Sequence, residues 1–382
     1  MQNNSPNTKQ KKKKKTKKQL KVRLALYLVG IAAVIVAFLV YVRTAPPAEK
    51  QTQSESVPEA VVTEAPPRET TPVPTPTPFP EEPPLTVEEQ VANCFKAFDS
   101  LTGEEEFESL GGYEAPEEQI YQIRKWIKDF QFHGYTLGFI MIDIPTGKGI
   151  AYNPKQEYYS ASSVKGPYMV SLIANEKDVL KEWGEIIEEI AHTSDNGCYS
   201  MLFRNFGEQY YNAWCDEAQA SAYMYNGYNY TYYSPEGLAR LWMLNYKFFT
   251  TDPDMGETAG ELFENPEYSL IHKTLYPIYK TRSKSGWINI GESSAIDSGI
   301  IYAGDHPYLL TVLSDFGGDI EKFTPLVYQI ERVHQDIIAE DSLSVSKEVR
   351  GKLQEEETQE TQQTQETQQT QQTQQTQQTQ EA

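Results

Sequence analysis

The stretch GFIMIDIPTGKGIAYNPKQEYYSASSVKGP, residues 138–167, predicts strand, turn, strand and helix in succession. Residues 136–144 are rich in β-branched and aromatic side chains, which favour an extended strand. The segment PTGK then turns the chain into GIAYN, so residues 136–153 predict a β-hairpin. From Ser162 to Ala174 the apolar residues recur at helical spacing.

Helical and extended segments alternate in blocks along the chain. Helical spacing is found over 87–107, 117–132 and 183–192 and after Ser234, which is a predicted N-cap, and strand-like runs cover 282–290, 295–302 and 308–316 before a final helix over 320–338. This order predicts an α+β fold, in which an antiparallel sheet is flanked by N- and C-terminal helices and carries an inserted, mostly helical subdomain. We expect the chemistry in the cleft between sheet and subdomain.

The formal net charge is −20, yet the first residues are strongly basic. Residues 1–23 hold a basic cluster, and residues 24–42 carry no charged side chain. A helix over 24–42 would be roughly 28 Å long, close to the thickness of a bilayer's hydrocarbon core. Because basic segments stay inside, we expect a single-pass cell-membrane anchor with the rest of the chain extracytoplasmic. A cleaved signal peptide is the alternative, but no small-x-small cleavage site follows.

Two further segments lack the composition of a folded domain. Residues 44–85 are rich in proline and threonine, which predicts an extended stalk. Residues 351–382 are a Thr/Gln-rich repeat without apolar side chains, which predicts a disordered tail. The single folded domain is therefore expected over 86–350.

Cysteine and histidine usage gives little indication of a metal site. The three cysteines are Cys94, Cys198 and Cys215, and a Cys198–Cys215 disulfide and three unpaired thiols are equally open. The five histidines show no His-x-x-x-His spacing, so we predict no metal and no cofactor. We also expect no nucleic-acid partner.

The segment SASSVKGPY, residues 160–168, contains one serine with a lysine three residues later, Ser162 with Lys165. On a helix these side chains share a face, so the hydroxyl and amine can approach each other. Burial lowers a lysine pKa enough for it to take the serine proton. The pattern is weak alone, because Ser344 and Lys347 repeat it near the C-terminal tail.

Two other segments carry polar groups suited to the same cleft. Ser194, Asp195 and Asn196 lie in a break between helices, where Ser194 can pass a proton, Asn196 can bind a substrate carbonyl and Asp195 caps the next helix. The other segment comprises Lys284, Ser285, Gly286 and Trp287, and we expect it to form a strand. Lys284 and Ser285 would bind an anion, Gly286 would let a substrate backbone approach closely, and Trp287 N–H would be a second oxyanion donor. The alternative for residues 194–196 is ordinary helix capping, and the alternative for residues 284–287 is an ordinary polar edge strand.

In this order, Ser162-Ser163-Val164-Lys165, Ser194-Asp195-Asn196 and Lys284-Ser285-Gly286 resemble the three motifs of class A β-lactamases and penicillin-binding proteins. The resemblance extends over roughly residues 117–340. It implies that Ser162 attacks an amide or lactam carbonyl, Lys165 removes its proton, and Ser194 relays a proton to the leaving nitrogen. It further implies that Asn196 holds the substrate amide while Lys284 and Ser285 bind its carboxylate, giving an acyl-enzyme.

The chain departs from that pattern between Asn196 and Ser234. The family's Glu-x-x-Leu-Asn segment, whose glutamate activates the deacylating water, is absent, and Glu217 is the one glutamate near the expected distance. In its place is YMYNGYNYTYY, residues 223–233, with six tyrosines that either line a cleft for a polar ligand or pack a surface loop.

The resemblance therefore predicts a serine hydrolase acting on β-lactams or peptidoglycan peptides, D,D-peptidase-like with slow deacylation. A true β-lactamase is the second enzymatic interpretation, and a non-catalytic cell-wall binding or sensing domain is the third.

Overall fold

The computed structural model describes residues 84–104 and 107–343. The chain divides into two compact units, Met1–Phe79 and Pro80–Ala382, and all described residues belong to the second. The predicted segments 1–23, 24–42 and 351–382, and nearly all of the stalk over 44–85, lie outside the described residues. Within the described part, no helix has both the length and the apolar character needed to cross a bilayer.

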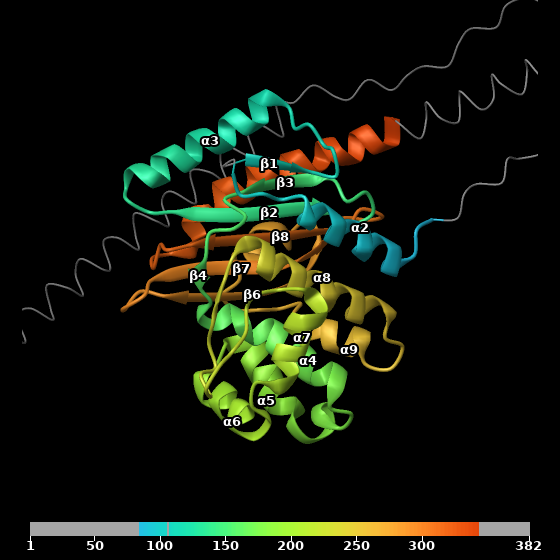
Figure 1. The fold of residues 1–382 in the computed structure, drawn as a ribbon, viewed down its shortest axis with the longest axis vertical. Coiled ribbons are helices and arrows are strands. Elements are labelled where there is room, and N and C mark those ends of the chain that lie inside the picture. Colours follow the sequence, from blue (N-terminus) through green and yellow to red (C-terminus); the bar gives the residue numbers. More distant parts are fainter. Residues whose placement is uncertain (1–83, 105–106, 344–382) are drawn as a thin grey trace, which may run out of the picture. The chain divides into compact units, whose positions relative to one another are not determined.

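A six-stranded antiparallel sheet forms the centre of the domain (Figure 1). Across the sheet the strands are β1 (Phe107–Leu110), β3 (Gly149–Tyr152), β2 (Leu137–Asp143), β8 (Tyr308–Ser314), β7 (Ser294–Tyr302) and β6 (Lys280–Ile288). The predicted hairpin is confirmed as β2 and β3, and the three predicted late strands as β6, β7 and β8. Strand β6 lies at one edge of the sheet, on the side of the helical subdomain (Figure 1).

Helices cover both faces of this sheet. On one face lie α3 (Glu117–Phe132), α10 (Leu270–Leu275), the short turn η2 (Ile320–Phe323) and the helix over 324–343. On the other face lie α2 (Val87–Asp99), α8 (Pro235–Thr251) and α9 (Gly256–Glu261). Terminal helices thus flank the sheet, which confirms the predicted α+β class.

The inserted subdomain follows β3 along the chain. Its elements are β4 (Tyr158–Tyr159), η1 (Ala161–Val164), α4 (Lys165–Asn175), α5 (Val179–Thr193), α6 (Asn196–Phe206), α7 (Gln209–Ala218) and β5 (Tyr232–Tyr233). Strands β4 and β5 form a separate two-stranded ladder. The subdomain is mostly helical, as predicted from the sequence.

One predicted helix was too long. The helix expected over 87–107 ends at Asp99, where Ser100 Oγ donates to the Ala97 carbonyl at 2.6 Å. Gly103 then adopts a φ of +73°, which a helix cannot accommodate, and β1 begins at Phe107. Helical spacing of apolar residues alone did not reveal this turn.

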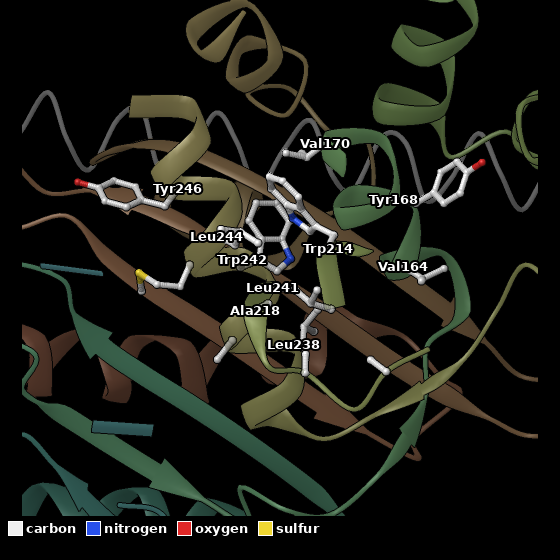
Figure 2. Close-up of a cluster of buried hydrophobic side chains, with 14 of the residues drawn as sticks. Val164, Tyr168, Val170, Trp214, Ala218, Leu238, Leu241, Trp242, Leu244 and Tyr246 are labelled. Atoms are coloured by element: carbon white, nitrogen blue, oxygen red, sulfur yellow. The ribbon is translucent and has the colours of Figure 1, made fainter. Parts of the chain in front are cut away.

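The subdomain and the sheet share one apolar core, which positions the start of α4. Figure 2 shows Val164 and Tyr168, on either side of Lys165, in the same cluster as Trp242 and Leu238 of α8. Trp242 packs so closely on Gly166 that an added Cβ there would be 3.3 Å from its ring. The first turn of α4 is therefore held against α8, and side chains projecting from this turn have defined positions.

Candidate active site

Three serines precede Lys165, and the structure gives them different environments. Ser160 and Ser163 are buried: Ser160 Oγ accepts from Thr231 N at 3.2 Å, and Ser163 Oγ donates to the Ser160 carbonyl at 2.6 Å and contacts the Tyr233 hydroxyl. Ser162 is half-buried, and its hydroxyl has no hydrogen-bond partner among the described residues. Ser162 is thus the serine of this turn whose hydroxyl is both accessible and free.

The turn that carries Ser162 has a constrained backbone. Ala161 adopts a φ of +43°, in the left-handed region that non-glycine residues seldom occupy. Residues 161–164 form the 3₁₀ turn η1, and α4 begins directly at Lys165. A backbone conformation of this kind persists only when its surroundings hold it, which the Ser160 and Ser163 hydrogen bonds do here.

Lys165 reaches the break between α5 and α6. Its Nζ donates to the Ser194 carbonyl and to Asn196 Oδ1, each at 2.7 Å, and lies 5.2 Å from the centre of the Tyr199 ring. The expected approach of Lys165 to Ser162 does not take the form of a hydrogen bond in the described structure. An ammonium has three N–H donors, and these two hydrogen bonds leave one of them unassigned.

Both lysines donate hydrogen bonds to Ser194. Its backbone is left-handed, with a φ of +64° at the end of α5, and this turns its side chain toward the sheet. Lys284 Nζ, on β6, donates to Ser194 Oγ at 2.7 Å and to the Ser285 carbonyl at 3.2 Å. Asp195 caps α6 by accepting from Cys198 N at 2.7 Å, as predicted.

Lys284 and Ser285 are adjacent on β6, so their side chains project to opposite faces of the sheet. Ser285 pairs with Asp297 of β7, and Lys284 pairs with Ser298. A substrate carboxylate can therefore contact both residues only across the open edge of β6. The predicted anion site at these two positions stays a prediction.

Gly286 lies against the turn that carries Ser162. A Cβ added at Gly286 would be 2.4 Å from Ser162 N and 2.2 Å from Ser163 N. This glycine therefore allows the backbone of the nucleophile turn to pack on β6. Its predicted role in letting a substrate backbone approach stays a prediction. Trp287 follows with its side chain 48 % exposed at the end of the strand.

Burial shifts the pKa values of Lys165, Lys284 and Asp297. Burial lowers the pKa of Lys165 to about 8, although Asp195 opposes the shift. Burial and then the charge of Lys165 lower the pKa of Lys284 to about 7, with Asp297 acting in the opposite direction. Burial raises the pKa of Asp297 to about 6, against hydrogen bonds from Ile271 N and Ser269 Oγ. Both lysines thus change charge near neutral pH, which is common at catalytic sites.

Two tyrosines complete the site and were not singled out from the sequence. Tyr199 is buried under Lys165 and donates to the Asn229 carbonyl at 2.7 Å, and Tyr230 donates to Asn196 Oδ1 at 3.3 Å. Tyr199 lies three residues after Asn196 on α6, so the i, i+3 spacing was an available signal. Tyr230 belongs to the tyrosine-rich stretch 223–233, whose role the sequence left open.

Glu217 does not belong to this site. It is exposed on α7, and its carboxylate lies 3.5 Å from Lys247 Nζ on α8. Its surroundings include Ala174 and Asn175, which end α4, whereas Lys165 begins that helix. A helix rises about 1.5 Å per residue, so the two ends of α4 are roughly 14 Å apart. The possibility that Glu217 activates a deacylating water is therefore excluded by its position.

The cysteines and histidines take no part in a metal centre within the described residues. All three cysteines, Cys94, Cys198 and Cys215, are free thiols, so the disulfide considered from the sequence is not formed. No group of three His, Cys, Asp or Glu side chains suited to holding a metal ion occurs in residues 84–104 and 107–343.

Comparison with known proteins gives one family match. A model described as the β-lactamase enzyme family matches residues 177–322. The match includes Ser194, Asn196 and the strand with Lys284, and it begins after Ser162 and Lys165. No curated protein sequence matches the chain.

Several solved structures are similar to the chain at low identity. A β-lactamase from Sphaerobacter thermophilus is 13 % identical with a TM-score of 0.47, covering 56 % of this chain and 95 % of its own. A protein titled PBP-A is 14 % identical with a TM-score of 0.47, covering 60 % of this chain and 99 % of its own. A β-lactamase from Chitinophaga pinensis is 12 % identical with a TM-score of 0.46, covering 57 % of this chain and 97 % of its own.

Residues 177–322, which include most of the inserted helical subdomain and strands β6, β7 and β8, are therefore similar in sequence to the β-lactamase enzyme family.

Proposed function

We propose that the domain is an active-site-serine hydrolase in which Ser162 forms an acyl-enzyme with β-lactams or cell-wall peptides. One observation carries the proposal. Lys165 and Lys284 each donate a 2.7 Å hydrogen bond to Ser194, beside the one serine of the turn whose hydroxyl is accessible and free of partners. A free hydroxyl, a lysine with a lowered pKa and a second hydroxyl that can donate a proton are the parts that serine acyl transfer needs.

In the acylation step, Ser162 Oγ attacks the carbonyl carbon of an amide or lactam. Neutral Lys165 takes the hydroxyl proton, which its pKa of about 8 allows at mildly alkaline pH. The carbonyl oxygen becomes an oxyanion, which the backbone N–H of Ser162 at the start of the helix stabilises.

Collapse of this tetrahedral intermediate breaks the carbon–nitrogen bond. Ser194 gives its Oγ proton to the leaving nitrogen, and the proton that Lys165 took from Ser162 replaces it once Lys165 Nζ moves from the Ser194 carbonyl to Ser194 Oγ. Lys284, hydrogen-bonded to Ser194 Oγ, supplies positive charge for the substrate carboxylate, with Ser285 at the edge of β6. Asn196 holds the substrate amide, and Trp287 N–H is the second oxyanion donor.

We expect deacylation to be slow, as in a D,D-peptidase-like enzyme, and not fast, as in an efficient β-lactamase. Among the described residues, no carboxylate accepts a hydrogen bond from Lys165, and Asn196 Oδ1 already accepts hydrogen bonds from Lys165 and Tyr230. Tyr230 is a neutral phenol near pH 7, and burial raises its pKa further, so little phenolate is present to act as a base. The acyl-enzyme therefore lacks an evident group to activate water.

The proposed location is the outer face of the cell membrane. It is based on the sequence of residues 1–42, in which a basic segment precedes an uncharged apolar run of nineteen residues, 24–42. A proline-rich stalk over 44–85 would then separate the domain from the membrane.

The test is time-resolved labelling of the full chain with a fluorescent penicillin. We expect covalent label that persists and is lost in Ser162→Ala but retained in Ser344→Ala. Rapid label turnover with accumulation of hydrolysed penicillin would show a β-lactamase instead. Absence of any label, or its loss in Ser344→Ala alone, would refute the assignment of Ser162.

A further inference from the structure

The tyrosine-rich loop 220–231 forms an open groove next to the candidate active site. The groove has a volume of about 550 Å³, within the usual range of ligand sites. Five tyrosine side chains line it, together with Glu157, Ser221, Asn226 and Thr231; the tyrosines are Tyr223, Tyr225, Tyr228, Tyr230 and Tyr232. Its lining contains no aliphatic side chain, so every ring is bordered by hydroxyl, amide or carboxylate groups.

The loop is anchored on its inner side. Asn212 of α7 holds Met224 through two hydrogen bonds of 2.9 Å, one to the backbone N–H and one to the carbonyl. Thr231 Oγ1 donates to the Tyr223 carbonyl at 2.9 Å, and Met224 is buried. The backbone is therefore fixed although its outer side chains face solvent.

The exposed rings are brought together by a tight turn. Asn226 and Gly227 have φ values of +56° and +75°, and Tyr228 N donates to the Tyr225 carbonyl at 3.0 Å. These are features of a type I′ turn, which brings the Cα atoms of Tyr225 and Tyr228 within about 7 Å of each other. Tyr225 is 63 % exposed, Tyr228 74 % and Tyr232 43 %. Three large rings held in water on a fixed backbone form a preorganised surface for a ligand.

The groove and the candidate active site are joined through Tyr230. Tyr230 lines the groove and also donates to Asn196 Oδ1 at 3.3 Å. Tyr232 pairs with Tyr159 in the β4–β5 ladder, three residues before Ser162. A molecule acylating Ser162 can therefore extend from Asn196 into the groove.

We propose that this groove binds a neutral saccharide as a subsite of the hydrolase. Pyranose rings have apolar C–H faces that pack on aromatic rings, and their hydroxyl and acetamido groups suit the carboxylate of Glu157 and the amide of Asn226. The carboxylate and the chain's formal net charge of −20 disfavour an anionic glycan. This inference rests on the proposed function, because a saccharide subsite of the hydrolase implies that the peptide that acylates Ser162 carries a sugar.

The experiment measures binding of a soluble β-1,4-linked tetramer of N-acetylglucosamine to the full chain by isothermal titration calorimetry. We expect saturable binding that weakens about three- to tenfold in Tyr225→Ala and in Tyr228→Ala. Tyr228→Phe retains the ring and should bind nearly as well as the unchanged protein. Tyr121→Ala removes a tyrosine of α3 that is 57 % exposed outside the groove, and it should bind as the unchanged protein does.

Parallel labelling with penicillin keeps this test separate from that of the proposed function. Ser162→Ala should lose the label yet retain saccharide binding, and Tyr225→Ala should retain both the label and its melting temperature. No saturable binding of the tetramer, equal weakening in Tyr121→Ala, or tighter binding of an oligouronate than of the neutral tetramer would overturn the inference.

Discussion

Lys165 and Lys284 approach Ser194 from two elements, one donating to its carbonyl oxygen and the other to its hydroxyl, both at 2.7 Å. The two ammonium groups are thereby held close together in a buried region, and the charge of Lys165 is one cause of the lowered pKa of Lys284. In the proposed mechanism, this arrangement would couple proton transfer at Ser162 to the charge of Lys284 on β6.

The first prediction concerns the pH dependence of acylation. The mechanism needs neutral Lys165, whose pKa is about 8, and protonated Lys284, whose pKa is about 7. Lys165 is increasingly protonated below pH 8 and Lys284 increasingly neutral above pH 7, so the required pair is a minority form that is most populated between pH 7 and pH 8. The labelling rate should therefore peak in this range and fall on both sides of it. Rates measured with excess penicillin at a series of pH values check this. A rate that keeps rising to pH 10 would show that the charge of Lys284 is not needed.

A second prediction is that Lys165→Met removes activity but not the fold. We expect labelling to slow by about 10²- to 10⁴-fold, because the general base is lost. The free energy of unfolding should change by less than about 2 kcal/mol, since two lost hydrogen bonds and one removed buried ammonium act in opposite directions. Urea unfolding measures this. Lys247→Met, which removes a surface ion pair with Glu217, is the control and should label normally.

Gly286→Ala is the third prediction, and it tests the contact between β6 and the nucleophile turn. The added methyl would meet the backbone at Ser162 and Ser163, so we expect a loss of about 1–3 kcal/mol of stability and strongly reduced labelling. Gly184→Ala is the matched control, because nothing lies within 4 Å of its added Cβ in α5. It should stabilise the protein by about 0.5–1 kcal/mol. Equal effects of the two substitutions would contradict the packing argument.

The fourth prediction concerns deacylation. Glu217 is exposed and paired with Lys247 away from the site, so Glu217→Gln should change the lifetime of the penicillin adduct by less than about twofold. The adduct is followed by gel fluorescence after excess penicillin is removed. A much longer lifetime in this variant would mean that Glu217 reaches the acyl group after all.

Much of the fold was predictable because its signals are local. The β2–β3 hairpin, α3 over residues 117–132 and the cap of α8 at Ser234 follow from residue periodicity and capping within short windows. The helix after Val87 was predicted too long, since it already ends at Asp99 with Ser100 as its C-cap, which the spacing of apolar residues does not indicate. The packing of Gly286 on the turn that carries Ser162 could not be predicted, because the two positions are more than a hundred residues apart in sequence.

By itself, the sequence determined which residues are candidates for the chemistry and on which elements they lie: Ser162 and Lys165 at a helix start, Ser194 in a break, Lys284 on a strand. Only the tertiary structure decided that these residues meet, because the hydrogen bonds at Ser194 join positions 29 and 90 residues apart. It also decided which serine is free and how far the lysine pKa values fall. Burial produces both results, and burial depends on the packing of helices against the sheet, which no short stretch of sequence contains.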